Sequence, residues 1–67
     1  MITILVNGEQ KSFAQPIALQ EALEILQIKG QRMAIEVNGE VVPKSRYGDY
    51  ILKDGDRLEV VIAVGGG

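Results

Sequence analysis

The chain has 67 residues, with seven Lys and Arg against nine Asp and Glu, and it contains neither cysteine nor histidine. This length allows one small domain that buries only ~60% of its unfolded surface, and neither disulfides nor a Cys/His metal site can support it. A formal net charge of -2 argues against a general nucleic-acid binder, which needs a basic stripe. Because thiol and imidazole groups are missing, we predict no catalytic residue, no metal site and no enzyme.

Membrane and secretion signals are not apparent in the sequence. No apolar run approaches the ~20 residues that span a bilayer, and the opening MITILVNGE lacks the positive flank and small-residue cleavage site of a secretory signal. We therefore predict a cytoplasmic chain that has no membrane contact and is monomeric when free.

The first predicted elements form a β-hairpin. Residues 2–6 alternate with the period of a strand, and the Asn7-Gly8 pair favours a tight turn because both residues tolerate positive φ. A second strand, at about residues 10–13, should therefore return antiparallel to the first. Pro16 prevents this strand from continuing as a central strand.

One amphipathic helix is predicted next, because apolar side chains recur at helical spacing from Leu19 onward. The stripe consists of Leu19, Ala22, Leu23 and Leu26, and it is widened by Ile25 and Ile28. Ala18 cannot cap the start of this helix. Lys29 and Gly30 predict its end, with Gly30 as the C-cap.

The segment MAIEVNGEVVP repeats the hairpin pattern, with Asn38-Gly39 as the turn and Pro43 at the end of the return strand. Residues 44–53 are predicted to be irregular. The last strand begins near Leu58, where apolar and other side chains alternate again along LEVVIAV.

Between these elements, Asp54-Gly55-Asp56 could suggest a cation loop. Two acids without a third ligand or a downstream bidentate glutamate fall short of a calcium site. Turn chemistry is the better interpretation, because aspartate and glycine are the residues that tight turns favour.

The element order is two strands, one helix and two or more strands, which predicts an α+β fold. The long crossover allows the last strand to lie parallel beside the first. We therefore predict a ubiquitin-like β-grasp domain over residues 1–64. Its mixed four- to five-stranded sheet carries the helix on one face and has the first and last strands, parallel to each other, in the centre.

Residues 65–67 are predicted to be a flexible C-terminal tail of three glycines. Because Gly65 and Gly66 have no Cβ, a partner could thread the tail through a narrow channel and bind it by backbone hydrogen bonds. The carboxylate of Gly67 is ionised at neutral pH, so it is a poor electrophile until something activates it. The sequence thus predicts a protein substrate that carries a reactive group.

A partner-docking surface is predicted beside the root of this tail. Leu5, Val61 and Ala63 should share the sheet face that the helix leaves uncovered, and such a cluster suggests docking. Single exposed apolar residues are also ordinary, and a loop could cover them. Glu59 and Glu36 on the same face could orient a basic partner or could be solvated neighbours.

Several segments together resemble the ThiS family, the ubiquitin-like sulfur carriers of thiamine biosynthesis. They are the hairpin ILVNGE, the segment VNGEVVPKSRY, the stretch LKDGDRLEVV and the ending Gly66-Gly67. The resemblance covers nearly the whole chain, including its length. Tyr47 stands where relatives often carry tryptophan, which bears on packing more than on chemistry.

The resemblance implies a mechanism and partners. An ATP-dependent, E1-like adenylyltransferase of the ThiF type would adenylate the carboxylate of Gly67. A sulfur donor, such as the persulfide of a cysteine desulfurase, would replace the adenylate and leave a thiocarboxylate. The carrier would then deliver sulfur to a ThiG-type thiazole synthase. No cofactor is bound, because the adenylate and the thiocarboxylate are transient covalent modifications.

Two alternatives remain open at this stage. The small subunit of molybdopterin synthase is a carrier of the same type, although those chains are usually longer and tend to have an aromatic residue and a proline shortly before the glycines. A stand-alone β-grasp binding module would need a basic surface and no special terminus.

Overall fold

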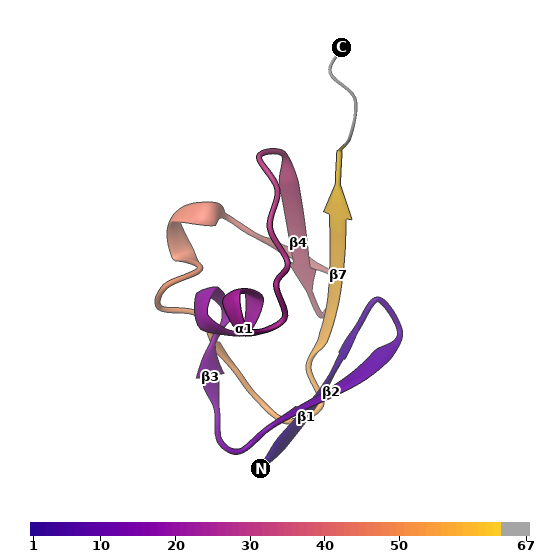
Figure 1. The fold of residues 1–67 in the computed structure, drawn as a ribbon, viewed down its shortest axis with the longest axis vertical. Helices are drawn as coiled ribbons and strands as arrows, with labels where there is room; N and C mark the ends of the chain where they lie inside the picture. Colours follow the sequence, from indigo (N-terminus) through magenta and orange to yellow (C-terminus); the bar gives the residue numbers. More distant parts are fainter. Residues whose placement is uncertain (64–67) are drawn as a thin grey trace.

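The structure, a computed structural model, describes residues 1–63, and the predicted tail lies outside them together with Val64. The described elements, in chain order, are β1 (Ile2–Val6), β2 (Glu9–Phe13), β3 (Ile17–Ala18), α1 (Leu19–Ile25), β4 (Met33–Val37), β5 (Glu40–Val42), a 3-10 helix η1 (Lys44–Arg46), β6 (Ile51–Leu52) and β7 (Arg57–Ile62). The N-terminus and the end of β7 lie at opposite ends of the long axis (Figure 1).

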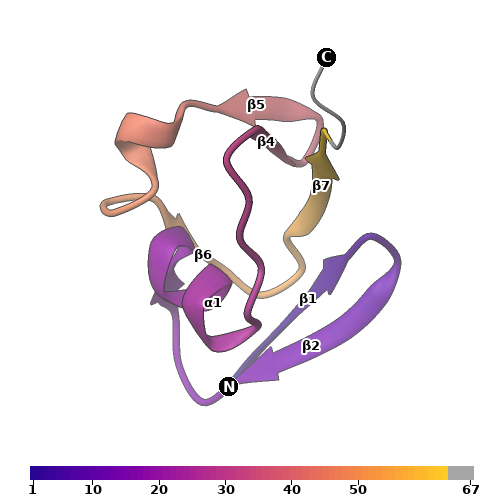
Figure 2. The ribbon, with the colours of Figure 1, turned by 45° about the horizontal axis from the view of Figure 1, so that its top comes forward.

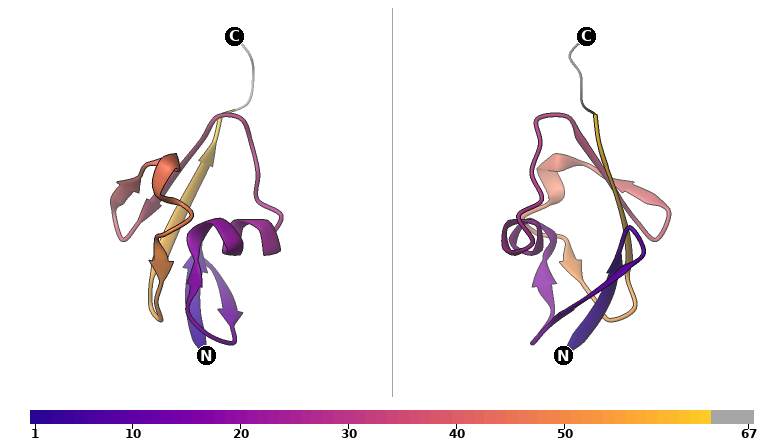
Figure 3. Two further views of the ribbon diagram at one scale, coloured as in Figure 1. Left: turned by 90° about the vertical axis from the view of Figure 1, so that its left-hand side faces the viewer. Right: turned by 45° about the vertical axis from the view of Figure 1, so that its right-hand side comes forward.

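The main sheet of the described residues has five strands in the order β2-β1-β7-β4-β5 (Figure 2). β1 pairs antiparallel with β2 and parallel with β7, and β7 pairs antiparallel with β4. Helix α1 lies on one side of this sheet (Figure 3). The predicted ubiquitin-like β-grasp fold is therefore confirmed, including the parallel first and last strands inside the sheet.

The core forms between the sheet and α1 because alternate residues of each strand point toward the helix. In β1 the burial pattern alternates between buried and half-buried positions. The large side chains with the least exposure come from α1 and from strands β1, β4, β6 and β7, and they are Ile4, Leu19, Ile35, Val37, Leu52 and Leu58. Packing of these apolar side chains supplies the main driving force for folding, at roughly 25 cal/mol per Å² of apolar surface buried.

Both predicted Asn-Gly turns are present. Asn7 and Gly8 have φ values of 50° and 86°, and Asn38 and Gly39 have 54° and 87°. Two consecutive positive φ angles define the type I′ hairpin turn, whose twist matches that of the flanking strands. The two hairpins β1–β2 and β4–β5 follow from this local chemistry.

The predicted end of the helix was wrong. Helix α1 ends at Ile25, and Gln27, with a φ of 58°, takes the left-handed position that was assigned to Gly30. The N–H of Ile28 donates to Leu23 O at 2.9 Å, and that of Gln27 donates to Glu24 O at 3.1 Å, which is the Schellman pattern. The physical reason is packing, since Ile28 contacts the core directly after this turn.

Three residues at the end of the helix differ from their predicted roles. Lys29 lies beyond the last turn, and Ile25 is 58% exposed, so neither has its predicted role. Gly30 instead lies where two segments approach closely. A Cβ at this position would lie 3.1 Å from Ile62 Cγ2, so the chain after the helix passes close to the end of β7.

Residues 44–53 are more regular than predicted. They contain η1 and strand β6, which pairs with β3 in a second, two-stranded sheet. This segment also completes the start of α1, where Ala18 provides no side-chain cap. The N–H groups of Leu19 and Gln20 donate to the carbonyls of Tyr50 and Tyr47, at 2.7 and 2.8 Å, and so satisfy two of the donors that have no partner within the helix.

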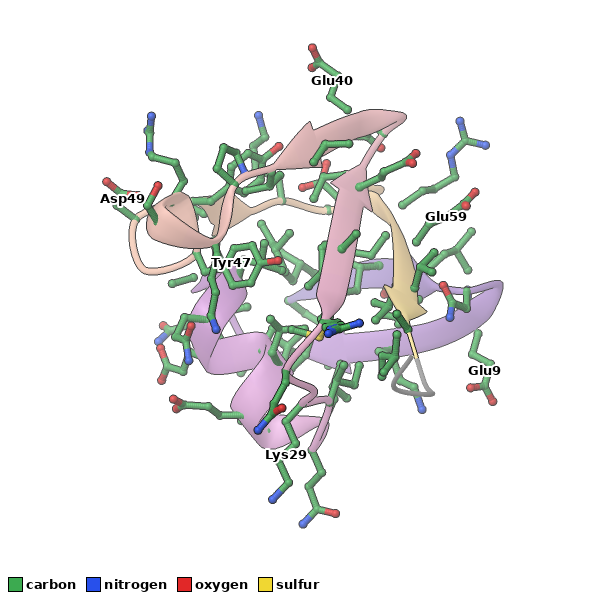
Figure 4. The ribbon with its side chains drawn as sticks, turned by 90° about the horizontal axis from the view of Figure 1, so that it is seen from above. Glu9, Lys29, Glu40, Tyr47, Asp49 and Glu59 are labelled. Carbon is green, nitrogen blue, oxygen red and sulfur yellow. The ribbon has the colours of Figure 1, made fainter. Side chains whose placement is uncertain are left out.

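Tyr47 packs into the core on this side of the molecule. It is almost completely buried, and Figure 4 shows its ring between the helix and the sheet. Burial raises the pKa of the Tyr47 phenol above its ordinary value, because a phenolate is poorly solvated there.

Candidate functional site: the anchored end of β7

Strand β7 leads to the C-terminus and is held along both edges. On one edge β1 pairs with it at Leu5↔Arg57 and Val6↔Leu58. On the other edge β4 pairs with it from Val37↔Leu58 to Met33↔Ile62. The N–H of Ala63, the last described residue, still donates to Arg32 O at 2.9 Å. The backbone of β7 is therefore held by hydrogen bonds up to Ala63, the last described residue.

Asn7 extends the hold on β7 beyond the end of β1. Its side-chain Oδ1 accepts a hydrogen bond from Val60 N at 2.8 Å, and its Nδ2 donates to Val60 O at 3.1 Å. The carboxamide thus presents the same donor and acceptor as one more residue of a parallel strand. Sequence reasoning assigned Asn7 only to the turn. Its position at the end of β1, beside a parallel neighbour, was the signal for this second role.

Asn38 holds the beginning of β7 in a related way. Its Oδ1 accepts from Arg57 N at 3.0 Å, while its Nδ2 donates to Asp56 Oδ1 at 3.0 Å. Asp56 is itself buried and accepts a second hydrogen bond from Lys53 N at 2.8 Å. The carboxylate is thus satisfied by donors from two loops, as a buried charge requires.

The Asp54-Gly55-Asp56 segment is a turn, as predicted. Gly55 has a φ of 90°, and the N–H of Asp56 donates to Lys53 O at 3.1 Å. Asp54 Oδ1 accepts from Thr3 N at 2.8 Å, which ties the turn to β1. Among residues 1–63, no group of three or more acidic side chains is arranged to hold a metal ion.

The residues of the predicted docking surface lie on one face. The strand register places Leu5, Glu59, Val61 and Ala63 on the side of the sheet opposite α1. Leu5 is half-buried, whereas the other three side chains are exposed, and Val61 is 61% exposed. Figure 4 shows Glu59 pointing away from the helix. The geometry of this surface agrees with the prediction, while its role in docking stays a prediction.

The same register adds residues that sequence reasoning did not assign to this surface. Ala34 lies opposite Val61, and Val41 lies opposite Glu36, so both extend the face across β4 and β5. Glu36 is directly opposite Glu59. Like charges at such a position destabilise a sheet, so the acidic pair opposes folding and is available to a basic partner.

The terminal glycines and a possible membrane span were also considered in the sequence. The predicted site residues Gly65, Gly66 and Gly67 lie outside the described residues, so their roles stay predictions. In residues 1–63, α1 is far too short to cross a bilayer, and no other helix is long and apolar enough to do so.

Comparison with known proteins decides the family. The sequence model of the ThiS family matches residues 4–67, which include β7 and the terminal glycines. The chain belongs to the ThiS family. The match confirms the resemblance found in the sequence, and it joins the described end of β7 and the three glycines in one family pattern.

Known members and relatives of the ThiS family differ in length. The sulfur carrier protein ThiS of Escherichia coli (strain K12) is 28% identical over 64 residues, which are 96% of this chain and 97% of that protein. The thiazole synthase of Paramagnetospirillum magneticum is 38% identical, also over 64 residues, which are 96% of this chain. This chain spans about a fifth of the length of that thiazole synthase, as the match covers 20% of it.

A solved ThiS structure has the same fold. The crystal structure of the thiamine biosynthesis protein ThiS from Geobacter metallireducens superposes with a TM-score of 0.84 at 29% sequence identity. The superposition covers 98% of this chain and 100% of that one. The β-grasp architecture is therefore shared over nearly the whole chain.

Proposed function

We propose that this ThiS-family chain is a sulfur carrier of thiamine biosynthesis and that the sulfur is held as a thiocarboxylate on Gly67. The observation that carries the proposal is the family match over residues 4–67, which includes the terminal glycines. The similarity to the E. coli sulfur carrier over 96% of the chain supports the same function. The anchoring of β7 up to Ala63 supports it further, since a rigid strand presents whatever follows it to a partner.

The chemistry follows from the carboxylate. Its oxygen attacks the α-phosphate of ATP and releases pyrophosphate, which gives an acyl adenylate. A persulfide of the sulfur donor then attacks the acyl carbon and expels AMP. A second thiol breaks the resulting acyl disulfide, leaving the thiocarboxylate and a disulfide. In this scheme the chain is a protein substrate that a ThiF-type adenylyltransferase acts on, and a cysteine desulfurase supplies the persulfide.

Thiazole synthase is the proposed acceptor of the sulfur. The thiazole synthase of P. magneticum contains a segment that is 38% identical to nearly all of this chain. A relative in which both parts form one polypeptide supports an association between the corresponding separate proteins. We therefore propose that a ThiG-type enzyme receives the sulfur in thiazole formation, in the cytoplasm where we expect this chain to be.

The exposed sheet face is the proposed docking surface for the activating enzyme. It combines the apolar side chains of Leu5, Val61 and Ala63 with the carboxylate of Glu59 next to the root of the tail. Burial of the apolar residues would supply affinity, and the acidic pair formed by Glu59 and Glu36 would orient a basic partner.

The carrier function is tested by incubating the chain with a ThiF-type enzyme, ATP, a cysteine desulfurase, cysteine and a thiol reductant. We expect the intact mass to increase by the difference between one sulfur and one oxygen. A chain that lacks Gly66 and Gly67 is the control and should not change. An unchanged mass in the full chain would exclude the proposal. Recovery of molybdoenzyme activity in a strain that lacks its molybdopterin sulfur carrier, without rescue of a thiamine-requiring strain, would favour the molybdopterin alternative.

The docking surface is tested by a matched pair of substitutions. Val61 and Ile25 are 61% and 58% exposed, but they lie on opposite sides of the sheet. We expect Val61→Glu to lower the rate of thiocarboxylate formation about tenfold at limiting carrier, because it places a charge in the apolar contact. Ile25→Glu should leave the rate unchanged. Equal rates in both variants would remove this face from the proposal.

A further inference from the structure

One edge of β7 is open at its end, as the direction of its backbone groups indicates. Asn38 N donates to Arg57 O at 2.8 Å, and Ala63 N donates to Arg32 O at 2.9 Å. In an antiparallel pair, residues that hydrogen-bond to one neighbour alternate with residues that face the other side. Residues 57, 59, 61 and 63 therefore face β4. Leu58, Val60 and Ile62 direct their N–H and C=O groups toward the β1 side.

The β1 side is occupied only as far as Val60. Leu58 O accepts from Asn7 N at 2.9 Å, and the Asn7 side chain takes both backbone groups of Val60. The chain then reverses direction at the Asn7-Gly8 turn and continues as β2, antiparallel to β1. β1 does not reach Ile62, and within the described residues the β1–β7 pairing ends at Val6↔Leu58.

A groove of about 350 Å³ runs along this open edge. Val60 and Ile62 of β7 form one wall, and Leu26 and Ile28, which follow α1, form another. The β1–β2 hairpin supplies the rest of the lining, in which the opposite charges of Glu9 and Lys11 balance. Ile62 is 42% exposed here, and Figure 4 shows the Glu9 side chain pointing outward from the β1–β2 hairpin.

An extended peptide is the ligand that fits these features. An unpaired N–H and C=O on a strand edge bind the backbone of an added strand, and an adjacent apolar groove accepts one of its side chains. The length of the chain beyond Ala63 indicates which protein supplies this peptide. Four extended residues reach roughly 13 to 14 Å. An enzyme whose active site holds the Gly67 carboxylate must therefore place its surface close to Ile62.

We propose that the enzyme that activates Gly67 adds an extended segment to the open edge of β7, pairs it with Ile62, and places an apolar side chain in the groove of Ile28 and Ile62. The inference rests on the proposed carrier function. It assigns a second contact, on the helix side and at the edge of the sheet, in addition to the exposed face that carries Val61.

Hydrogen exchange of two neighbouring amides tests the pairing. The chain is exchanged free and in complex with a ThiF-type enzyme, and each amide is measured after quenching. The Val61 amide, which faces β4, should exchange slowly in both states. The Ile62 amide should exchange rapidly in the free chain and at least about tenfold more slowly in the complex. Unchanged exchange at Ile62 in the complex, or protection that grows with the concentration of the free chain, would overturn the proposal. The latter result would identify a second copy as the occupant.

A semisynthetic chain with an N-methyl group on Ile62 provides the functional test. The change removes one donor from the open edge and leaves every side chain as it is, and a chain N-methylated at Gln15, in the exposed loop before β3, is the control. We expect the Ile62 variant to show an about tenfold higher KM for thiocarboxylate formation, with kcat little changed.

The outcomes separate the two proposals. If the unmodified and the Ile62-methylated chains are converted with the same KM, the edge proposal fails and the carrier function stands. If the unmodified chain is never converted, both fail. Circular dichroism of the methylated chain verifies its fold, and the exchange experiment on the unmodified chain decides the edge proposal if that fold is lost.

Discussion

The two Asn-Gly turns have the same sequence and similar φ angles, yet their asparagine side chains hold different parts of β7. Asn38 lies at the start of β7 and shares its hydrogen bonds with the buried carboxylate of Asp56. Asn7 lies toward the end of β7, and its side chain bonds the exposed backbone of Val60. The first turn is thus tied to a buried carboxylate through a part-buried hydrogen bond, whereas the second makes only exposed side-chain hydrogen bonds next to the proposed site. A local motif that forms a hairpin in both places acquires its second role from the strand beside it.

Asn→Asp substitutions should give the largest difference in stability between the two turns. Asn38→Asp replaces the donor to Asp56 with a second carboxylate oxygen at about the same distance, and we expect a loss of about 3 kcal/mol at pH 7. In Asn7→Asp a carboxylate oxygen replaces the amide donor and faces the Val60 carbonyl. Because this group lies at the surface, the side chain can turn to water, so we expect a loss of about 1 kcal/mol. Urea unfolding measures both values, and equal losses would contradict the distinction.

The pH dependence of these two variants should also differ. Two facing carboxylates raise a pKa in folded Asn38→Asp above the unfolded value of about 3.9. The folded state then binds the extra proton more readily, so the penalty is complete above that raised pKa and shrinks as the pH falls through it toward 4. The Asn7→Asp penalty should show no comparable recovery in acid.

Glycine substitutions sharpen the comparison by keeping the positive φ and removing only the side-chain bonds. We expect Asn38→Gly to lose about 2 kcal/mol and Asn7→Gly about 1 kcal/mol, since the first leaves a donor and an acceptor near Asp56 without their partner. The functional ranking should be the reverse. Asn7→Gly loosens the end of β7 and should slow thiocarboxylate formation about threefold, whereas Asn38→Gly should leave the rate of the folded protein unchanged. The mass assay and unfolding curves on the same samples test whether the ranking by stability and the ranking by rate are opposite.

The smallest predicted effect concerns Tyr47, which belongs to neither turn and provides a common reference. Its raised pKa means that the unfolded chain releases the phenolic proton first as the pH rises. The stability associated with Tyr47 is therefore present below about pH 10 and is lost as the pH rises through the folded-state pKa. Both aspartate variants should share this alkaline decline, and Tyr47→Phe should reduce it in either background. A decline that differs between the two variants would show that Tyr47 is coupled to one of the turns.

Local patterns predicted most of the elements correctly. The alternation in β1, β4 and β7, the two Asn-Gly turns and Pro43 after β5 gave the strands within one or two residues. The same alternation assigned Leu5, Glu59, Val61 and Ala63 to one face of the sheet, where the strand register places them. This worked because the side-chain period of a strand is fixed and a turn depends on its own residues.

The errors occurred where distant segments satisfy local backbone groups. Helix α1 ends at Ile25 and its last turn is closed at Gln27, because Ile28 packs into the core, although Gly30 has the better intrinsic preference for a C-cap. Its start is completed by carbonyls of Tyr47 and Tyr50 from the segment that was predicted to be irregular. Neither contact leaves a signal in the nearby sequence.

The sequence by itself determined the β-grasp element order, the exposed sheet face and the family, because each depends on periodicity, turn residues or a motif that can be read along the chain. Only the tertiary structure decided how β7 is held. The clamp of Asn7 on Val60, the network of Asn38 and Asp56, and the open edge at Ile62 all arise where two strands meet that are more than 50 residues apart or belong to different hairpins. A hydrogen bond across such a distance depends on the register of the assembled sheet, and that register is set by the packing of the whole core.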